Sequence, residues 1–316
     1  MFNEEIELQP IGMVETYMAT DLTTVENNIR KNLQRNLPEI ENLPEWKKSK
    51  KDFPLAVAGG GPSIKYTVDT LRNFKIIIAA GSAHDWLVEH NIIPTYCLII
   101  DPDPISANYL KHPQVTTNYL VASCCDPKVF DTLNGYQVTR WHSAGNDPQW
   151  YDTEWQKAGL SDINKKPVIG GGCTCGLRAI SIAMLFGYAN LHFFGMDSNL
   201  DLNTNEHHAY NFVDPVNEHL GDVITMRLGD KEHGRVFKVA KYMMAQLWGF
   251  KDLIQNHGHR FNVTVHGDSI IYEFMRIRNL EIERLKNATQ KIRDEEIRNE
   301  GTQSQNTQPN IESKCS

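Results

Sequence analysis

The stretch LAVAGGGPSIKYT, residues 55–67, decides the fold. A short apolar run ends in Gly59–Gly61, and Pro62 and Ser63 then lead into a segment with a helical composition. A buried strand that passes through a glycine-rich turn into a helix is typical of an open α/β sheet. A tight turn needs only one or two glycines. Three of them indicate that another group comes close to the backbone here.

The alternation of apolar runs with helix-like segments continues along the chain. Near-continuous apolar runs suit strands that are covered on both faces, as in a parallel sheet. Such runs lie at 53–59, 75–81, 95–101, 118–123, 167–172, 190–197 and 260–267. Helix-like segments lie at 62–73, 82–91 and 174–187, and an amphipathic helix is expected around 234–256. Alternating strands and helices predict an α/β fold with a doubly wound, mostly parallel, Rossmann-like sheet.

The regions on either side of this alternation have a different composition. Residues 1–52 read as a helical N-terminal extension and linker, 53–275 as a nucleotide-binding transferase domain, and 276–316 as a charged helix and tail. From Gly301 onward Gln, Asn, Ser and Thr dominate, which predicts disorder.

Composition excludes several classes of protein. The 316 residues carry a net charge of −7, which argues against a nucleic-acid or anionic-membrane surface. No apolar run approaches the ~18 residues of a membrane span, and the acidic start does not resemble a signal peptide. The six cysteines form neither a secreted disulfide framework nor a CxxC zinc pair. We therefore expect a cytoplasmic protein.

The glycine loop is the first candidate for chemistry. Ligands of open parallel sheets sit beyond the carboxyl ends of the strands. Exposed N–H groups of Gly59, Gly60, Gly61 and Ser63, next to a helix N-terminus, would cradle a phosphate. The loop is neither a Walker A motif nor the dinucleotide fingerprint. The alternative is a glycine-rich turn without a ligand.

Two aspartates follow a later strand. Asp101 stands at the tip of the strand and Asp103 two residues on, where paired carboxylates can hold Mg²⁺ against phosphates. The alternative is an Asp-Pro turn that caps the next helix, and we favour it for Asp103.

A second glycine-rich turn, GGGCTCG, occupies residues 170–176. Small residues there let a ligand approach, and Thr174 can donate a hydrogen bond. The C-x-C pair suggests metal or redox chemistry, but small core-edge residues are the favoured interpretation.

Further polar residues follow later strands. Asp197 ends one strand, and His207, His208 and Tyr210 lie in the loop after it. A histidine there can serve as a general base, although loop histidines are often merely solvated. Ser269 follows the last predicted strand, where its hydroxyl can contact a ligand.

Together these residues resemble a known family. Five stretches in this order are similar to the domain of the MptE-like 6-hydroxymethylpterin diphosphokinases, which flagellin motility accessory factors share. They are AVAGGGPSI, IIIAAGSAHDWLVEHNIIPTYCLIID, GGGCTCGLRAISIAMLFGYANLHFFGMD, HHAYN and FNVTVHGDSII, within residues 53–272. The layout also resembles that of bacterial CMP-sialic-acid-dependent sialyltransferases.

The resemblance implies roles for individual residues. Within the glycine loop, the residues that match the sialyltransferases' nucleotide-phosphate loop are Gly59, Gly61, Pro62 and Ser63. His208, with Tyr210, falls where they place a histidine that acts as catalytic base. The other implied nucleotide contacts are Gly172, Thr174, Asp197 and Ser269.

Two positions depart from the pattern. Where sialyltransferases have an asparagine, this chain has Asp101, which would need a cation to approach phosphate. Gly81 stands where relatives usually carry Asp or Asn, so Ser82 or His84 would have to replace that substrate contact.

Three functions follow as hypotheses. The leading one is a nucleotide-dependent, glycosyltransferase-like enzyme that moves a nonulosonic-acid group from a CMP-sugar to a hydroxyl acceptor. The second is a Mg²⁺- and ATP-dependent diphosphokinase acting on a 6-hydroxymethylpterin-like alcohol. The third is a nucleotide-binding protein without turnover. The partners are small molecules in each case, and a homo-oligomer is left open.

Overall fold

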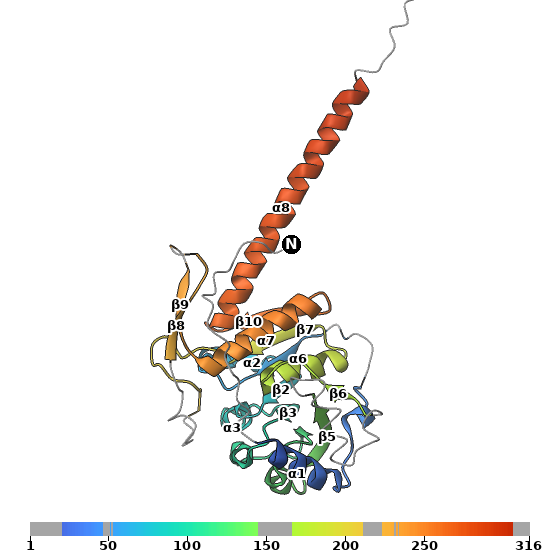
Figure 1. Ribbon diagram of the computed structural model, residues 1–316, viewed down its shortest axis with the longest axis vertical. Helices are drawn as coiled ribbons and strands as arrows, with labels where there is room; N and C mark the ends of the chain where they lie inside the picture. The colour runs from blue at the N-terminus through green and yellow to red at the C-terminus, as the bar shows by residue number, and fades with distance from the viewer. Residues whose placement is uncertain are drawn as a thin grey trace, which may run out of the picture. The chain divides into compact units, whose positions relative to one another are not determined.

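The computed structural model describes residues 21–46, 51, 53–144, 166–210, 223–230, 232 and 234–305, with side chains up to residue 294. Contacts divide the chain into two compact units, Met1–Glu273 and Phe274–Ser316. The first unit contains the sheet and the helices packed on it. The second contains most of the last helix, α8 (Ile270–Gln305), which Figure 1 draws as one continuous helix.

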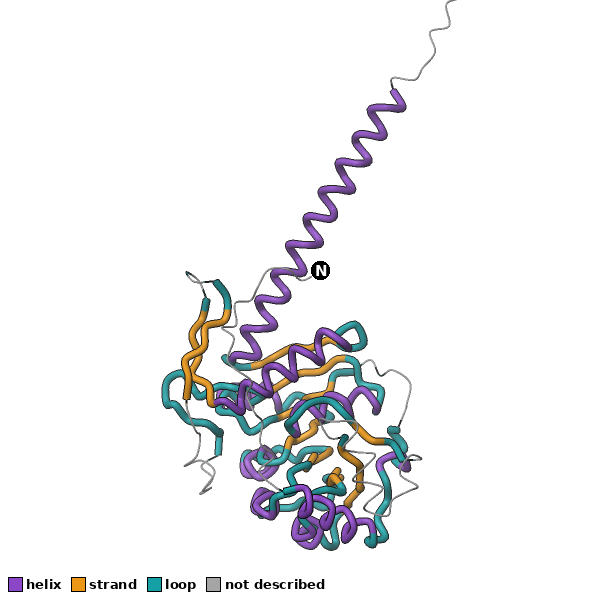
Figure 2. Tube along the Cα trace, in the orientation of Figure 1, coloured by secondary structure: helices purple, strands orange, loops and turns teal. Residues whose placement is uncertain are grey.

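Eight strands form a single sheet in which every pairing is parallel. Figure 2 shows strands and helices along the chain trace. They are β1 (Leu55–Ala58), β2 (Ile77–Ala80), β3 (Tyr96–Ile99), β4 (Asn118–Ala122), β5 (Gln137–Ser143), β6 (Val168–Ile169), β7 (Asn190–Phe194) and β10 (Asn262–His266). Their order is β10-β7-β1-β2-β3-β4-β5-β6. The chain thus moves outward from β1 to β6 and returns to the other side of β1. Such a reversal creates a switch point between β1 and β7.

Helices cover both faces of the sheet. Alternate residues of a strand point to opposite faces. Ala56 and Ala58 of β1 join one core cluster with residues of α2 (Ile64–Leu71) and α3 (Ala83–Glu89). Helix α6 (Cys175–Leu185) packs on β1, β2 and β3, and we place it on the opposite face. The predicted doubly wound α/β fold is therefore confirmed.

The N-terminal helix belongs to the first compact unit. Helix α1 (Leu22–Leu33) begins after Asp21, whose side chain accepts the Thr24 N–H at 2.9 Å. The Asn32 side-chain amide donates to the carbonyl oxygens of Ser123 and Cys125 at 3.0 and 2.7 Å. Buried amide hydrogen bonds thus fix α1 to the end of β4. The three-part division of the chain stays a prediction.

Strand β5 was not predicted from the sequence. It reads QVTRWHS, without an apolar run, yet Arg140 and His142 are buried in it. Arg140 donates to Glu39 Oε1 from Nε and Nη2 at 3.1 and 2.5 Å. Burial alone would raise the pKa of Glu39, but hydrogen bonds from His142, Arg140 and Lys166 hold it well below its usual range. The ion pair compensates for burying these charges.

The helix predicted for 234–256 begins later than expected. Residues 235–240 instead form β9 (Arg235–Ala240), which pairs antiparallel with β8 (Val223–Leu228), and α7 runs from Lys241 to His257. Phe237 and Val239 are buried while Lys238 between them is exposed, an alternation typical of a strand.

The remaining elements are short. They are α4 (Pro127–Thr132) and the 3₁₀ turns η1 (Ile40–Asn42) and η2 (Pro104–Tyr109). The last helix reaches Gln305, four residues beyond the position where disorder was predicted to begin, and residues 306–316 lie outside the described part. No helix of the described residues combines the length and apolarity needed to cross a membrane.

Candidate functional site

The loop after β1 lies directly against the loop after β7. The N–H groups of Gly59 and Gly61 donate to the carbonyl oxygens of Phe194 and Gly195 at 2.7 and 2.8 Å. A Cβ atom on Gly59 would lie 2.5 Å from the Gly195 oxygen, and one on Gly195, whose φ is +60°, would lie 2.4 Å from the Gly59 oxygen. Two of the three glycines are therefore required because backbone meets backbone.

This contact corrects the expectation of an open phosphate cradle. The N–H groups of Gly59, Gly61 and Ser63 are all hydrogen-bonded within the chain. They are therefore not available to bind an anion. Pro62 has no N–H. Within the described residues, only the Gly60 N–H of this loop has no hydrogen-bond partner.

Asp197 fastens the two loops together. Its carboxylate accepts the Ser63 N–H at 2.7 Å on Oδ2 and the Ser63 hydroxyl at 2.5 Å on Oδ1. Burial raises the pKa of Asp197 to about 6, although both bonds from Ser63 act to lower it. Since both carboxylate oxygens are engaged with Ser63, the structure gives Asp197 a role in holding the glycine loop.

The loop after β10 reaches the same place. A Cβ atom on Gly267, whose φ is +92°, would lie 2.5 Å from Ser63 Oγ. The fully buried Ser269 accepts the Tyr272 N–H on its hydroxyl oxygen at 3.1 Å. Ser269 thus lies at the predicted rim, where its hydroxyl caps the start of α8.

His208 lies over the glycine loop. Its Nδ1 is 3.2 Å from the Gly60 carbonyl oxygen, which also accepts the Ala209 N–H at 2.9 Å. A carbonyl oxygen only accepts hydrogen bonds, so Nδ1 carries a proton, and in the neutral form of the ring the lone pair is on Nε2. A Cβ atom on Gly60 would lie 2.6 Å from Ser82 Oγ. Gly60, Ser82 and His208 therefore form one cluster.

His207 lies against the His208 ring, with 3.9 Å between the ring centroids, and contacts α7. Its Nε2 is hydrogen-bonded to the Tyr242 hydroxyl on α7. Tyr210 donates its hydroxyl to Glu89 at 2.7 Å, and this bond is the main cause that raises the pKa of Tyr210. Of the two histidines that the sequence left open, His208 is thus the one beside the glycine loop.

The ends of β2 explain one departure from the family pattern. Gly81 has a φ of +47°, in the left-handed region that glycine, asparagine and aspartate tolerate best. His84 is fully buried between Asp85 and Tyr119, with its ring nitrogens 2.9 and 3.0 Å from their oxygens. The suggestion that His84 contacts substrate is therefore wrong, and Ser82 remains in place beside Gly60.

The second glycine-rich turn lies at the same rim of the sheet, directly before α6. Its N-cap is Thr174, which accepts the Leu177 N–H at 3.3 Å. A Cβ atom on Gly81 would lie 3.6 Å from Cys175 Sγ, and one on Gly176 would lie 2.3 Å from Met196 Sδ. The N-terminus of this helix, with its partial positive charge, therefore adjoins the ends of β2 and β7.

The rest of this turn is shaped by its own helix. Gly172 has a φ of +101° and lies against Leu177. Burial raises the pKa of Cys175 to about 12, which keeps the thiol neutral. No cluster of three metal-ligating side chains occurs among the described residues. Of the C-x-C pair, Cys173 is exposed and Cys175 is half-buried.

The two aspartates after β3 have different surroundings. Asp103 accepts the Ile105 N–H at 2.8 Å and caps η2, as the capping alternative predicted. Asp101 is exposed and accepts the Asp103 N–H at 3.0 Å. Since neighbouring strands lie about 4.8 Å apart, the end of β3 is roughly 10 Å from the glycine loop. One or two carboxylates, together with the phosphate oxygens of a substrate, are the ligands through which proteins commonly bind Mg²⁺.

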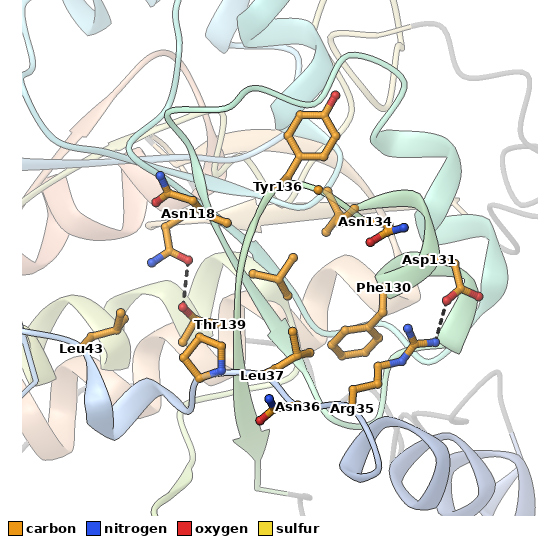
Figure 3. A pocket seen from close by; sticks show the side chains of 15 residues that line it. Arg35, Asn36, Leu37, Leu43, Asn118, Phe130, Asp131, Asn134, Tyr136 and Thr139 are labelled. Atoms are coloured by element: carbon orange, nitrogen blue, oxygen red, sulfur yellow. Dashed lines mark hydrogen bonds and ion pairs between the residues drawn. The ribbon is translucent and has the colours of Figure 1, made fainter.

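A separate hollow lies at the opposite ends of the strands (Figure 3). Its volume is about 980 Å³, and it is lined by residues at the starts of β4 and β5 and after α1. Arg35 and Asp131 form an ion pair of 2.7 Å at its border, and Thr139 donates to Asn118 at 2.9 Å. None of the predicted site residues lines this hollow, so the candidate site remains at the carboxyl ends.

Comparison with known proteins identifies the family of the chain. Residues 27–201 match the model of the family described as 6-hydroxymethylpterin diphosphokinase MptE-like. The chain belongs to this family. No curated protein matches it in sequence.

Two solved structures are similar. The MAf glycosyltransferase from Magnetospirillum magneticum AMB-1 has a TM-score of 0.58 and 16% identity, over 80% of this chain and 38% of that one. The chain thus spans well under half of that protein. The monofunctional alpha-2,3-sialyltransferase Cst-I from Campylobacter jejuni has a TM-score of 0.32 and 15% identity, over 75% of this chain and 81% of that one. The first likeness shows a shared fold.

Proposed function

We propose that this protein is a nucleotide-dependent transferase with the reacting groups at Gly60, Ser82 and His208. The observation that carries the proposal is the hydrogen bond from His208 Nδ1 to the Gly60 carbonyl. It holds the ring over the switch point of the sheet, where ligands of such folds bind, with Nε2 as the nitrogen that would take up a proton.

The donor's phosphates would bind differently from the first expectation. Three amides of the glycine loop are occupied. The remaining donors are the Gly60 N–H, the Ser82 hydroxyl and the N-terminus of α6 after Thr174. A helix N-terminus and an unpaired amide are the groups that bind phosphate oxygens in other α/β proteins.

The leading reaction is glycosyl transfer. The acceptor hydroxyl oxygen forms a bond to the anomeric carbon of a nonulosonic acid, and the bond from that carbon to the phosphate oxygen of CMP breaks. The electron pair leaves with CMP, and His208 Nε2 takes the hydroxyl proton. The fold shared with a MAf glycosyltransferase supports this choice.

The alternative reaction is diphosphate transfer, which the description of the family favours. The alcohol oxygen of a 6-hydroxymethylpterin-like acceptor would bond to the β-phosphorus of ATP. The bond from that phosphorus to the bridging oxygen would break, the electron pair would leave with AMP, and His208 would take the alcohol proton. Mg²⁺ held by Asp101 would neutralise phosphate charge. Asp103, as a cap, is the weaker ligand.

Nucleotide binding separates these reactions. We expect CMP, or ATP with Mg²⁺, to raise the melting temperature, because a ligand at 100 times its dissociation constant stabilises by about 2.7 kcal/mol. Asp101→Asn should remove a Mg²⁺-dependent shift while Asp103→Asn should retain it. If neither nucleotide shifts the transition, the proposal is wrong.

Turnover is tested at the histidines. His208→Ala should abolish product formation and keep the nucleotide-induced shift, whereas His207→Ala should keep both. A protein that binds nucleotide but forms no product with any acceptor is instead the non-catalytic binder.

A further inference from the structure

The far part of α8 exposes an apolar stripe. Leu285 and Ile292 each expose 57% of their surface, and Ile282 and Thr289 lie on the same face at alternating spacings of three and four residues. Such spacing is the a/d pattern of a coiled coil, with Ile282 and Thr289 at a and Leu285 and Ile292 at d. A shallow hollow of about 440 Å³ runs along this face. The residues that line it all belong to α8.

The one polar member of the stripe is suited to burial. The Thr289 hydroxyl donates to the Leu285 carbonyl oxygen of its own helix at 2.9 Å. Covering this face would leave no unsatisfied hydroxyl, so the penalty for burying a polar group is small. An isolated charged helix has little stability in water, which is a reason for this segment to have a partner.

The charged residues on either side of the apolar stripe indicate which partner fits it. In a parallel pair, the g residue of one helix faces the e residue of the next heptad on the other. Here g is Glu281 and that e residue is Lys286, so each helix offers an acid to the base of a second copy. In an antiparallel pair e meets e, and both e residues, Lys286 and Arg293, are basic. The charges are complementary only between parallel copies.

We propose that residues 281–293 of α8 form a parallel coiled coil with the same segment of a second copy of this chain. The first heptad, with Ile282 at a and Leu285 at d, has the combination that favours two strands. Only two heptads are apolar, so the dimer is expected to be weak and dependent on concentration. This inference does not depend on the proposed function.

Sedimentation equilibrium of the full chain tests the proposal. The apparent mass should rise from 36.0 kDa toward twice that value as protein concentration increases over about a hundredfold range. Leu285→Glu should raise the dimer dissociation constant at least about tenfold. Leu280→Glu is the matched control, because Leu280 is also exposed but lies at position f, outside the stripe. It should change the dissociation constant by less than about twofold.

Charge reversal tests the orientation. Lys286→Glu should weaken the dimer by about fivefold, and adding Glu281→Lys in the same chain should restore it. Circular dichroism of each variant verifies that the helix persists. A chain that stays at 36.0 kDa throughout, equal effects of Leu285→Glu and Leu280→Glu, or a tighter dimer with Lys286→Glu each overturns the proposal.

Discussion

Two glycine-rich turns in this protein have similar sequences and different structures. GGGPS after β1 is held by backbone hydrogen bonds to the β7 loop. GGGCT after β6 contains two glycines with positive φ, +124° at Gly171 and +101° at Gly172, and leads into the N-terminus of α6. The first turn uses glycine to bring two chain segments together, and the second uses it to shape a helix entry. Glycine content alone does not distinguish these uses.

The largest expected effect concerns the contact between the β1 and β7 loops. Gly195→Ala adds a Cβ atom 2.4 Å from the Gly59 oxygen at a φ of +60°. Steric overlap and backbone strain should together cost about 4 kcal/mol of the free energy of unfolding, measured by urea denaturation.

Gly135→Ala is the control for that change. Gly135 also has a positive φ, +91°, but a Cβ atom there meets nothing within 4 Å. It should cost only about 1 kcal/mol. Equal losses at the two positions would contradict the interpretation of the first turn as a contact between backbones.

The next effect depends on pH and on Asp197. Its pKa is about 6 in the folded protein and 3.8 in a free aspartate, so the folded state binds more protons between these values. Stability therefore falls as pH rises through this window, by about 3 kcal/mol in total. Asp197→Asn should remove this fall, as measured by unfolding at pH 4 to 7.

Asp201 provides a comparison of opposite sign. Its pKa is lowered: burial opposes the shift, but hydrogen bonds from Thr204 and Asn203 prevail. The stability that it contributes is lost as pH decreases. If Asp197→Asn and Asp201→Asn change the pH profile in the same direction, the account of Asp197 is wrong.

A smaller effect is expected at the second turn. Thr174→Ala removes the N-cap of α6 and should cost about 1 kcal/mol of unfolding free energy, while Thr174→Ser should retain it. If the N-terminus of α6 binds the donor's phosphates, Thr174→Ala also lowers nucleotide affinity in calorimetry, and an unchanged affinity would remove this turn from the site.

The smallest effect on stability is expected at Gly60. Its Cβ atom would meet the side chains of Ser82 and His208, which can move, so Gly60→Ala should cost no more than about 0.5 kcal/mol. It should nevertheless weaken nucleotide binding by about tenfold. Loss of folding together with binding would show that Gly60 serves the same purpose as Gly59 and Gly61.

The sequence predicted much of this fold because the central strands are apolar. Every residue of β1, β2 and β3 is buried. The apolar runs of sequence that form these strands are unfavourable in water, so the sequence alone places them in the core. Strand β5 was not predicted because its Arg140 and His142 are buried against Glu39. Glu39 lies about a hundred positions away in the sequence, so no local pattern indicates that these polar side chains are buried. Strand β9 was missed because its residues lie within 234–256, the range predicted as a helix, and no element was predicted at the position of β8.

The sequence predicted which loops lie together at the candidate site better than how these loops bind one another. The loops that end the strands do meet, since parallel strands share one rim. The sequence could not assign the backbone partners of Gly59 and Gly61, because these belong to β7, and it could not separate His207 from His208. Only the distance from His208 to the Gly60 carbonyl makes that distinction.

The place of β1 between β2 and β7 has a consequence for biosynthesis. The carbonyls that receive the Gly59 and Gly61 amides belong to Phe194 and Gly195, so a ribosome must add well over a hundred residues before this pairing can begin. Contacts between such distant positions slow folding. A nascent chain that has released only β1 to β6 therefore has an exposed central edge, which is where a chaperone would be needed.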